Sequence, residues 1–349
     1  MSRATKRRSA RLRTAPVGDV LVGDAVEQLR RLPDSSIDCV VTSPPYFRLR
    51  NYGHHGQLGL EDHVDDWVTN LVAVMAEVRR VLTDTGTVWL NVGDSYSRHP
   101  ASGAPPKSLV LAPERLLLAL AADGWWVRNK VVWAKTNPMP TSIKDRLATT
   151  WEPVYLLTKT PQYFFDLDAI RVPHRSRPAR PRRSDPGAVP NLVPEWQGPL
   201  AGTNSGLSRL KASGMAGHPL GKNPGDVWQI TTSNYRGGHH ATYPEALVST
   251  PILAGCPERV CARCTRPWTR QPADRSATPF RLGPIRSSCR CRSPWRPGIV
   301  LDPFMGSGTT AIAAQRHRRD WVGIDVNPTF ATLARQRVTG DAPTESRAA

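Results

Sequence analysis

Short apolar runs and amphipathic stretches alternate along the first half of the chain. Residues 20–22 and 37–42 are largely apolar and are followed by turn-forming residues, which predicts two buried strands with a helix at 25–32 between them. Between residues 64 and 82 apolar side chains recur every three or four positions, which predicts an amphipathic helix before a strand at 87–92. Because buried strands separated by helices are typical of parallel sheets, the pattern predicts an α/β fold.

The same pattern returns near the end of the chain. A strand at 298–301, a helix at 311–316 and a strand at 321–324 follow one another, but only 24 residues remain after Asp325. An open α/β sheet needs several more strands than these two. The N-terminal half must therefore complete the sheet, so the order of the segments looks circularly permuted.

No apolar periodicity is visible between residues 171 and 230. Seventeen of these sixty residues are Pro or Gly, and six arginines lie between positions 171 and 183. This composition predicts a flexible basic segment at 171–232. Two interpretations stay open: an inert linker, or a loop that follows a phosphate backbone, orders on binding and takes part in target recognition.

Composition points to a polyanionic partner. The 349 residues allow about two domains, or one large domain with insertions. Lys and Arg (47) exceed Asp and Glu (29) by 18, and only 39% of residues are hydrophobic against the usual ~45–50%, so part of the chain is not packed. The positive excess favours nucleic acid, because neutralised phosphates release counterions. A GC-rich genome, which inflates Arg, Pro and Ala, would produce the same excess without any binding role.

The sequence argues against a membrane protein and against an exported protein. The longest apolar candidate, residues 109–127, is interrupted by proline and charged residues, so we expect no membrane partner. The basic tail at 1–16 has no apolar stretch behind it and does not have the pattern of a signal peptide. We therefore expect a cytoplasmic protein, whose six cysteines are thiols or metal ligands rather than disulfides.

A glycine turn after the strand at 298–301 is the first candidate binding segment. The segment reads Asp302-Pro303-Phe304-Met305-Gly306-Ser307-Gly308-Thr309-Thr310. It opens a helix, and Asp325 ends the next strand 19 residues after Gly306. A tight glycine turn brings a ligand against the backbone, and an acid after the second strand suits ribose hydroxyls. These features predict a nucleoside-binding βαβ unit.

The acid that precedes the glycines narrows the choice of ligand. Asp302 would repel a pyrophosphate but suits a cationic ligand, such as an amino-acid ammonium beside a sulfonium. A phosphate-binding loop is excluded because the turn has no Gly-Lys-Ser/Thr. A dinucleotide site, with Ala311 in place of the third glycine, and a purely structural turn stay open as alternatives.

The second candidate segment, Thr42-Ser43-Pro44-Pro45-Tyr46, ends the strand at 37–42. Residues before proline are held extended and proline has no N–H, so the segment is stiff and its carbonyls are free to accept hydrogen bonds. Acceptors around the two N–H groups of an amine on a nucleobase would make its nitrogen more nucleophilic and stabilise the positive charge of attack. Tyr46 would stack on the base, which must first leave the duplex. Taken alone, such a segment is more often a plain turn.

With both segments in one chain, the sequence resembles the site-specific DNA amino-methyltransferases in their permuted order, where the catalytic segment precedes the cofactor segment. The resemblance covers residues 19–171 and 234–337. It implies a Rossmann-like methyltransferase sheet with S-adenosylmethionine as cofactor and direct in-line methyl transfer. It also implies double-stranded DNA as partner, with a cognate restriction endonuclease as a second partner to look for.

The resemblance also assigns site residues. The catalytic roles described above go to Ser43, Pro44, Pro45 and Tyr46. The implied cofactor-binding residues are Asp24 beside the adenine, Asp325 at the ribose hydroxyls, Asp302, Pro303, Phe304, Gly306, Gly308 and Thr309 along the methionine and ribose, and His240 and Pro244 near the methionine end. The segment that holds the last two residues departs from the family's spacing.

The first residue of the catalytic tetrapeptide bears on the target base. Family members with Ser there mostly resemble cytosine-N4 enzymes, whereas Asp or Asn mostly accompanies adenine N6, so Ser43 favours cytosine N4 with adenine N6 as the alternative. Carbon-5 methylation needs a cysteine nucleophile, typically in a Pro-Cys pair that this chain lacks, and Cys39 is interpreted as core. A non-catalytic zinc-containing DNA-binding protein, and methylation of RNA or of a protein amide, also stay open.

Four cysteines have the spacing of a metal site. Cys261-x2-Cys264 and Cys289-x-Cys291 can place four thiolates around one Zn²⁺, as in small zinc ribbons, although Cys-x-Cys is shorter than the usual pair. Unliganded reduced thiols are the alternative. Relatives that the chain resembles often run from Gly-Cys-Pro directly into the strand before the glycine turn, so residues 259–297 look like an insertion that leaves Cys256 spare. Nearby arginines would suit contact with DNA.

These observations predict a segmented organisation around one sheet. The segments are a basic disordered tail (1–16), the catalytic half (17–170), the basic flexible segment (171–232), the cofactor-binding half (233–258 and 298–338), the zinc-ribbon insertion (259–297) and a second disordered tail (339–349).

Overall fold

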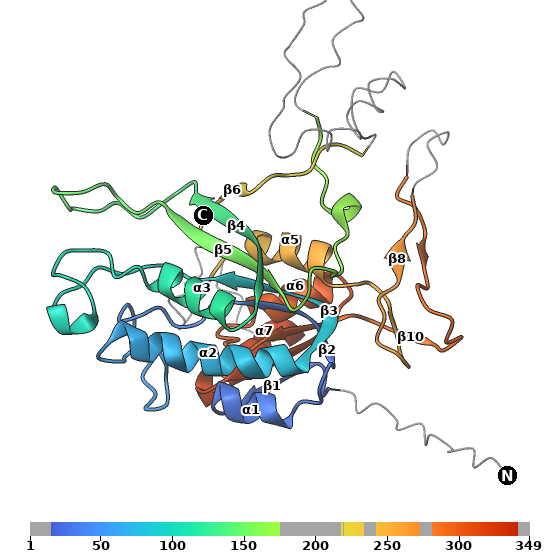
Figure 1. Ribbon diagram of the computed structural model, residues 1–349, viewed down its shortest axis with the longest axis horizontal. Helices are drawn as coiled ribbons and strands as arrows, with labels where there is room; N and C mark the ends of the chain where they lie inside the picture. Colours follow the sequence, from blue (N-terminus) through green and yellow to red (C-terminus); the bar gives the residue numbers. More distant parts are fainter. Residues whose placement is uncertain (1–14, 175–217, 219, 234–241, 273–280, 341–349) are drawn as a thin grey trace, which may run out of the picture. The chain divides into compact units, whose positions relative to one another are not determined.

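The computed structural model describes residues 15–174, 218, 220–233, 242–272 and 281–340, which fall into two compact units. The larger unit is built from the described parts of 1–166, 225–270 and 285–349 and contains an eight-stranded sheet (Figure 1). The strand order is β1 (Asp19–Val22), β12 (Asp320–Asp325), β11 (Ile299–Asp302), β2 (Ile37–Thr42), β3 (Leu82–Asn91), β5 (Trp151–Thr158), β4 (Trp126–Lys135) and β6 (Val227–Ile230).

Strands from the two ends of the chain lie side by side in this sheet. β11 pairs in parallel with β12 on one side and with β2 on the other, and β1 pairs in parallel with β12. Leu301 lies opposite Val40, and Val22 opposite Asp325. The N-terminal half therefore completes the sheet, as the pattern predicts. Since β2 and β11 run in parallel, Ser43 and the glycine turn emerge at the same edge.

The other end of the sheet differs from the parallel arrangement that the sequence favoured. β5 pairs antiparallel with both β3 and β4, and β6 then pairs in parallel with β4. The chain turns back between β4 and β5 without a crossover helix, so the two strands form an antiparallel pair. β6 lies inside the segment expected to carry no regular structure. With only four residues and an alternation of exposed and half-buried positions at the sheet edge, it has a weak sequence signal.

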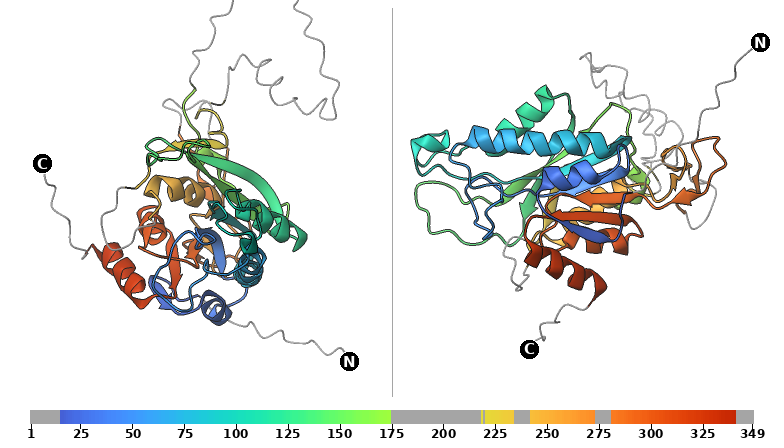
Figure 2. Two further views of the ribbon diagram at one scale, coloured as in Figure 1. Left: turned by 90° about the vertical axis from the view of Figure 1, so that its left-hand side faces the viewer. Right: turned by 90° about the horizontal axis from the view of Figure 1, so that it is seen from below.

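Helices cover both faces of the sheet (Figure 2). One layer holds α1 (Ala25–Arg31), α2 (Val64–Val81) and α3 (Ala112–Ala122). The other layer holds α5 (Glu245–Gly255), α6 (Thr309–Arg316) and α7 (Pro328–Thr339). A mixed sheet between two helical layers confirms the predicted α/β class. None of the described helices is long and apolar enough to cross a membrane.

The core under α2 fixes the position of the segment that follows β2. The predicted amphipathic pattern of α2 buries one apolar face, which includes Trp67, Leu71 and Val78. Trp67 is fully buried and meets Phe47 edge to face, with ring centroids 6.4 Å apart. Since Phe47 directly follows Tyr46, this packing holds the catalytic candidates against the core.

Small elements complete the larger unit. A short 3₁₀ turn, η1 (Pro100–Ser102), precedes α3 in the larger unit. Two-stranded antiparallel sheets join β7 (Val260–Cys261) to β10 (Trp295–Arg296), and β8 (Thr269–Arg270) to β9 (Ile285–Arg286).

The smaller unit comprises the described parts of 167–224 and 271–284. It holds η2 (Leu167–Ala169), next to which Arg171 pairs with Asp168 at 2.6 Å. Most of the predicted basic segment and of both tails lies outside the described residues.

Candidate active site

An open cavity of about 410 Å³ lies at the carboxyl ends of β2 and β11. Both candidate segments contribute to its wall. The predicted site residues that line it are Asp24, Ser43, Pro44, Pro45, Tyr46, Pro303, Phe304, Gly306, Thr309 and Asp325. Its volume is within the usual range for small-molecule and cofactor sites. The fold therefore brings together most of the residues that the two segments offered.

Asp325 holds the glycine turn between β11 and α6. Its carboxylate accepts hydrogen bonds from the backbone N–H groups of Gly306 (2.8 Å) and Asn327 (2.8 Å). Burial raises the pKa of Asp325 to about 6, because loss of water penalises the charge more than the two N–H groups stabilise it. Gly306 and Gly308 have φ angles of 53° and 85°, a left-handed backbone that favours glycine.

Asp302 is placed differently from its prediction. Its side chain is fully buried and is not part of the cavity wall. One carboxylate oxygen accepts from Thr42 Oγ1 (2.6 Å) and Phe304 N (3.0 Å), and the other from Thr310 Oγ1 (2.6 Å) and Tyr243 Oη (2.9 Å). With both oxygens engaged, the carboxylate ties β2 to the glycine turn. Asp302 was expected to contact a cationic ligand, but its carboxylate does not line the cavity.

Three further predicted residues are not among the described wall residues. Gly308 caps α6, and a Cβ there would lie 3.0 Å from Ala334 of α7, so this glycine allows two helices to approach closely. Pro244 is the N-cap residue of α5, while its neighbours Thr242 and Tyr243 line the cavity. His240 lies outside the described residues.

Thr309 offers the cavity an unused polar atom. Its hydroxyl is buried and has no hydrogen-bond partner among the residues that the structure describes. Leaving such a group unpaired costs about 1–3 kcal/mol, which a polar ligand atom would relieve. Tyr52 and Phe330 add an aromatic wall, with ring centroids 6.4 Å apart. Sequence reasoning missed both rings because neither belongs to a motif.

The residues from Ser43 to Tyr46 follow β2 into the cavity wall. The Pro45 carbonyl accepts a hydrogen bond from Trp67 Nε1 (2.9 Å), so it is not free as the sequence suggested. No donor among the described residues reaches the Pro44 carbonyl. Ser43 Oγ donates to Tyr46 Oη at 3.3 Å, which leaves lone pairs of Ser43 Oγ available. The acceptors offered to a ligand are thus Ser43 Oγ and the Pro44 carbonyl.

The Tyr46 ring is held from two sides. It lies against the backbone of Gly93, where a Cβ would be only 2.6 Å from the ring. Its hydroxyl donates to Glu152 Oε2 at 2.7 Å. Burial, and then the nearby Glu152 carboxylate, raise the pKa of Tyr46 well above its usual value, so the phenol stays protonated.

Glu152 is a charged group of the cavity that sequence reasoning missed. It lies on β5, where its carboxylate also accepts from Lys135 Nζ of β4 (2.5 Å) and from Asn91 Nδ2 of β3 (3.2 Å). An acid within the apolar run Trp-Glu-Pro-Val-Tyr-Leu-Leu was the available signal. A buried strand admits such a residue only with partners, and here β3, β4 and the segment after β2 supply them.

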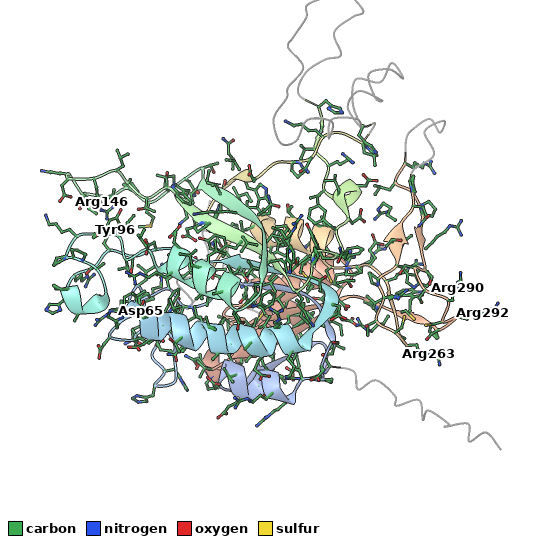
Figure 3. All side chains as sticks on the ribbon, viewed as in Figure 1. Asp65, Tyr96, Arg146, Arg263, Arg290 and Arg292 are labelled. Carbon is green, nitrogen blue, oxygen red and sulfur yellow. The ribbon has the colours of Figure 1, made fainter. Side chains whose placement is uncertain are left out.

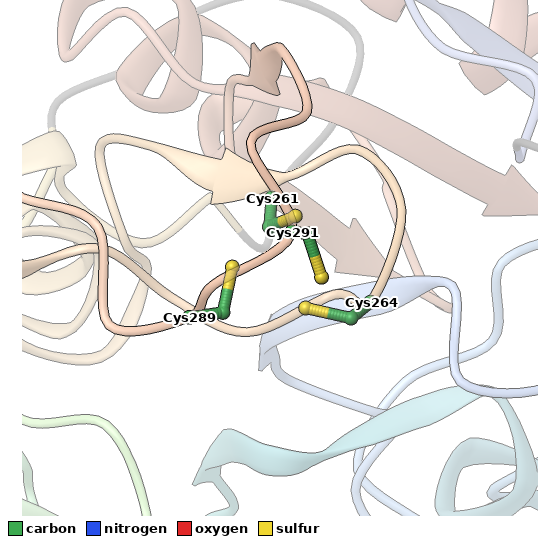
Figure 4. Close-up of side chains that lie close together, drawn as sticks. All are labelled: Cys261, Cys264, Cys289 and Cys291. Carbon is green, nitrogen blue, oxygen red and sulfur yellow. The ribbon is translucent and has the colours of Figure 1, made fainter.

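Four thiols converge in a second place (Figure 4). The Sγ atoms of Cys261, Cys264, Cys289 and Cys291 all lie within 4.8 Å of one another, as their spacing predicts. Four sulfurs around one Zn²⁺ at about 2.3 Å would be separated by about 3.8 Å, so the dimensions of the cluster fit such an ion. Cys256 is buried elsewhere and is not part of the cluster.

A comparison with protein families identifies the kind of active site that this cavity forms. The family model described as DNA methylase, an N6/N4 methyltransferase model, matches residues 37–336. The chain belongs to the DNA amino-methyltransferase family. It is therefore an S-adenosylmethionine-dependent DNA methyltransferase, and the non-catalytic alternative gains no support.

Curated relatives of this methylase are Type II methyltransferases. M.XycI of Xanthomonas campestris pv. cyanopsidis is 34% identical over 91% of this chain and 86% of its own length. M.SmaI of Serratia marcescens is 33% identical over 91% of this chain and 90% of its own length. M.SfiI of Streptomyces fimbriatus is 50% identical over 192 residues, which are 52% of this chain but only 46% of that relative.

Solved structures agree with the fold of the methylase. The cytosine-N4-specific PvuII DNA methyltransferase has a TM-score of 0.55 at 18% identity, over 94% of this chain and 92% of that one. TTHA0409 of Thermus thermophilus, complexed with S-adenosyl-L-methionine, has a TM-score of 0.53 at 20% identity, over 94% of this chain and 96% of that one. At such identities the likeness shows the fold.

Proposed function

We propose that this methylase transfers a methyl group from S-adenosylmethionine to N4 of a cytosine flipped out of double-stranded DNA. The proposal rests above all on one observation: the Ser43–Tyr46 segment and the glycine turn at 302–310 line one cavity. The first segment offers acceptors for an amine, and the second offers a wall for a nucleoside. We also infer that the chain is a circular permutation, since the segment of β11 and α6, which would bind the cofactor, comes last in sequence.

The described wall fits the cofactor. Asp325 would accept the ribose hydroxyls, Phe304 would pack against the cofactor, and Asp24 would approach the adenine. The Thr309 hydroxyl, which has no partner among the described residues, would gain one. When bound, S-adenosylmethionine supplies a methyl group on a positively charged sulfur. Asp302 would serve this site indirectly by holding the glycine turn to β2.

The catalytic segment would act on the amine through hydrogen-bond acceptors. An exocyclic amine of cytosine is a poor nucleophile because its lone pair is delocalised into the ring. Ser43 Oγ and the Pro44 carbonyl would accept its two N–H groups, localise the lone pair and stabilise the positive charge of attack. The Tyr46 ring would stack on the flipped base.

The choice of cytosine follows from Ser43 and from the likeness to the PvuII enzyme, which is cytosine-N4-specific. Adenine N6 is the alternative, because the same two acceptors could hold either amine. We propose duplex DNA as the partner, with residues 171–232 taking part in target recognition. Since the named relatives are Type II methyltransferases, we also propose that this methylase works with a restriction endonuclease.

The test is to identify the methylated base. The purified chain, S-adenosylmethionine and mixed-sequence duplex DNA are incubated, the DNA is digested to nucleosides, and the products are identified by mass. We expect N4-methylcytosine, and none when the methyl donor is omitted. N6-methyladenine as sole product would refute the choice of base, and the absence of any methylated nucleoside would refute the proposed activity.

We propose that the four-cysteine cluster binds one structural Zn²⁺. Cys261 on β7 pairs with Trp295 of β10, which leads directly into the start of β11, so the cluster lies at the opposite ends of the strands from Ser43 and Gly306. Arg263, Arg290 and Arg292 gather at this end (Figure 3). This position favours a metal that holds the start of β11 over one that contacts the target base.

Metal analysis tests the zinc assignment. We expect about one zinc per chain in protein purified without chelator, and loss of zinc in the variants Cys264→Ser and Cys291→Ser, because three thiolates hold the ion less tightly than four. Elemental mass spectrometry measures the ratio. Cys256→Ala is the matched control and should keep its zinc. Zinc-free wild-type protein, or zinc retained after both cluster substitutions are combined, would refute the assignment.

A further inference from the structure

The polar network behind Tyr46 has no role in the mechanism described so far. Glu152 is only 15% exposed, and Lys135 only 20%. Lys135 Nζ lies 2.5 Å from Glu152 Oε1, while Oε2 accepts from Tyr46 Oη (2.7 Å) and Asn91 Nδ2 (3.2 Å). Removing an ion pair from water costs several kcal/mol per ion. Apolar residues of similar volume would fill this part of the sheet equally well. A network retained in the cavity wall therefore calls for a chemical role.

The hydrogen bonds of this network run in one direction. Tyr46 has one phenolic proton, and the Glu152 carboxylate at 2.7 Å is a nearer and stronger acceptor than Asn91 Oδ1 at 3.1 Å. With that proton directed to Glu152, Tyr46 Oη accepts from Ser43 Oγ at 3.3 Å. The hydrogen-bonded chain from Ser43 through Tyr46 thus ends at the Glu152 carboxylate, which is largely buried in the cavity wall.

We propose that Glu152 is the final acceptor of the proton that the target amine loses during methyl transfer. The inference rests on the proposed function, because it needs the amine at Ser43. The amine nitrogen forms a bond to the methyl carbon while the methyl–sulfur bond breaks and its electron pair stays on sulfur. The nitrogen gives a proton to Ser43 Oγ, Ser43 gives its own to Tyr46 Oη, and Tyr46 gives its own to Glu152 Oε2. Ser43 and Tyr46 end as they began, and Glu152 ends neutral.

Lys135 and Asn91 are positioning residues in this relay. Lys135 holds Oε1, which leaves Oε2 directed at Tyr46. Asn91 Nδ2 also donates to the Pro153 carbonyl at 3.1 Å, which fixes the amide against β5. Within the described part of the chain, the ionisable groups facing Glu152 are Lys135 from β4 and Tyr46 from the segment after β2, with Tyr52 as the next neighbour of Tyr46.

The variant Glu152→Gln tests the relay. Glutamine keeps the shape and an acceptor oxygen for Tyr46, but its amide takes up no proton. We expect the single-turnover rate of methyl transfer to mixed-sequence DNA to fall about 100-fold at neutral pH, with binding of S-adenosylmethionine and DNA unchanged.

A double-mutant cycle distinguishes a proton relay from a purely structural network. Tyr46→Phe keeps the stacking ring but removes the middle group, so the double variant with Glu152→Gln should be about as slow as each single variant. Glu114→Gln, which breaks an exposed pair with Lys130 outside the cavity, is the matched control and should keep the wild-type rate. A wild-type rate in Glu152→Gln, or losses that multiply in the double variant, would overturn the relay alone. A wild-type chain that methylates no DNA would overturn the proposed function with it.

Discussion

Replacing Asp302 by alanine should lower the free energy of unfolding by about 3–5 kcal/mol and abolish binding of S-adenosylmethionine. The fully buried carboxylate accepts four hydrogen bonds, which join β2, the glycine turn and Tyr243. Alanine would leave three hydroxyls and one N–H without this acceptor, at about 1–3 kcal/mol each, less what they recover by turning to other partners. Urea unfolding measures the stability, and titration calorimetry the binding.

Two further variants define what the loss means. Asp302→Asn keeps the shape and one acceptor oxygen, so we expect it to lose about half as much stability as the alanine variant. Asp84→Ala removes a carboxylate that is 83% exposed and paired with Lys159, and should cost less than about 1 kcal/mol. An Asp302→Ala chain with the stability and the ligand binding of the wild type would show that the turn is held by other contacts.

The meeting of the two motif segments could be predicted from the sequence. The strands at 37–42 and 299–302 are short and buried, and each runs into its motif without a break. If the two strands pair in parallel, the two motifs must lie at the same edge of the sheet, because the carboxyl ends of neighbouring parallel strands share an edge. The four cysteines could be predicted to cluster for a similar reason, since two close pairs need only one turn each to converge.

The orientation of individual polar groups could not be predicted in the same way. Asp302 faces inward because Thr42, Thr310 and Tyr243 present hydroxyls to it from three parts of the chain. The Pro45 carbonyl is occupied because Trp67 of α2 packs beneath it. Such contacts depend on which helix covers which face of the sheet, and this cannot be predicted from the spacing of residues within a motif.

Glu152 and Lys135 were missed for a topological reason. They meet because β5 runs antiparallel to β4, with Glu152 paired to Trp133 and Trp151 to Ala134. The sequence suggested parallel strands, which would have separated these side chains. An isolated charge in an apolar strand is a signal that can be read, but its partner follows only from strand direction and register.

Replacing Arg296 by methionine should lower the free energy of unfolding by about 3–5 kcal/mol at pH 8. Arg296 lies on β10, close in sequence to the cysteine cluster, and pairs at 2.6 Å with Asp38 of β2, whose side chain is 2% exposed. Methionine keeps much of the apolar volume but leaves a buried carboxylate without its cation. The backbone N–H of Ile299, at 2.9 Å, would remain as a donor to it.

This loss should depend on pH in a defined direction. Burial raises the pKa of Asp38, and Arg296 lowers it, so the variant raises it further above the unfolded value of about 3.9. A raised pKa contributes stability that is complete below the unfolded value and is lost as pH rises through the folded value. The stability gap between variant and wild type should therefore be small at acidic pH and widen as the pH rises. A gap independent of pH would show that Arg296 acts through packing.

The pair of Arg316 with Glu245 provides the control, because Arg316 is 66% exposed and its change to methionine should cost less than about 1 kcal/mol at any pH. Chelation then tests the connection between metal and sheet. If the proposed zinc holds β10 so that Arg296 reaches Asp38, removing zinc from the wild type should also weaken this pair. Chelation should therefore destabilise the Arg296→Met chain less than the wild type, whereas additive losses would mean that the cluster and β2 are stabilised independently.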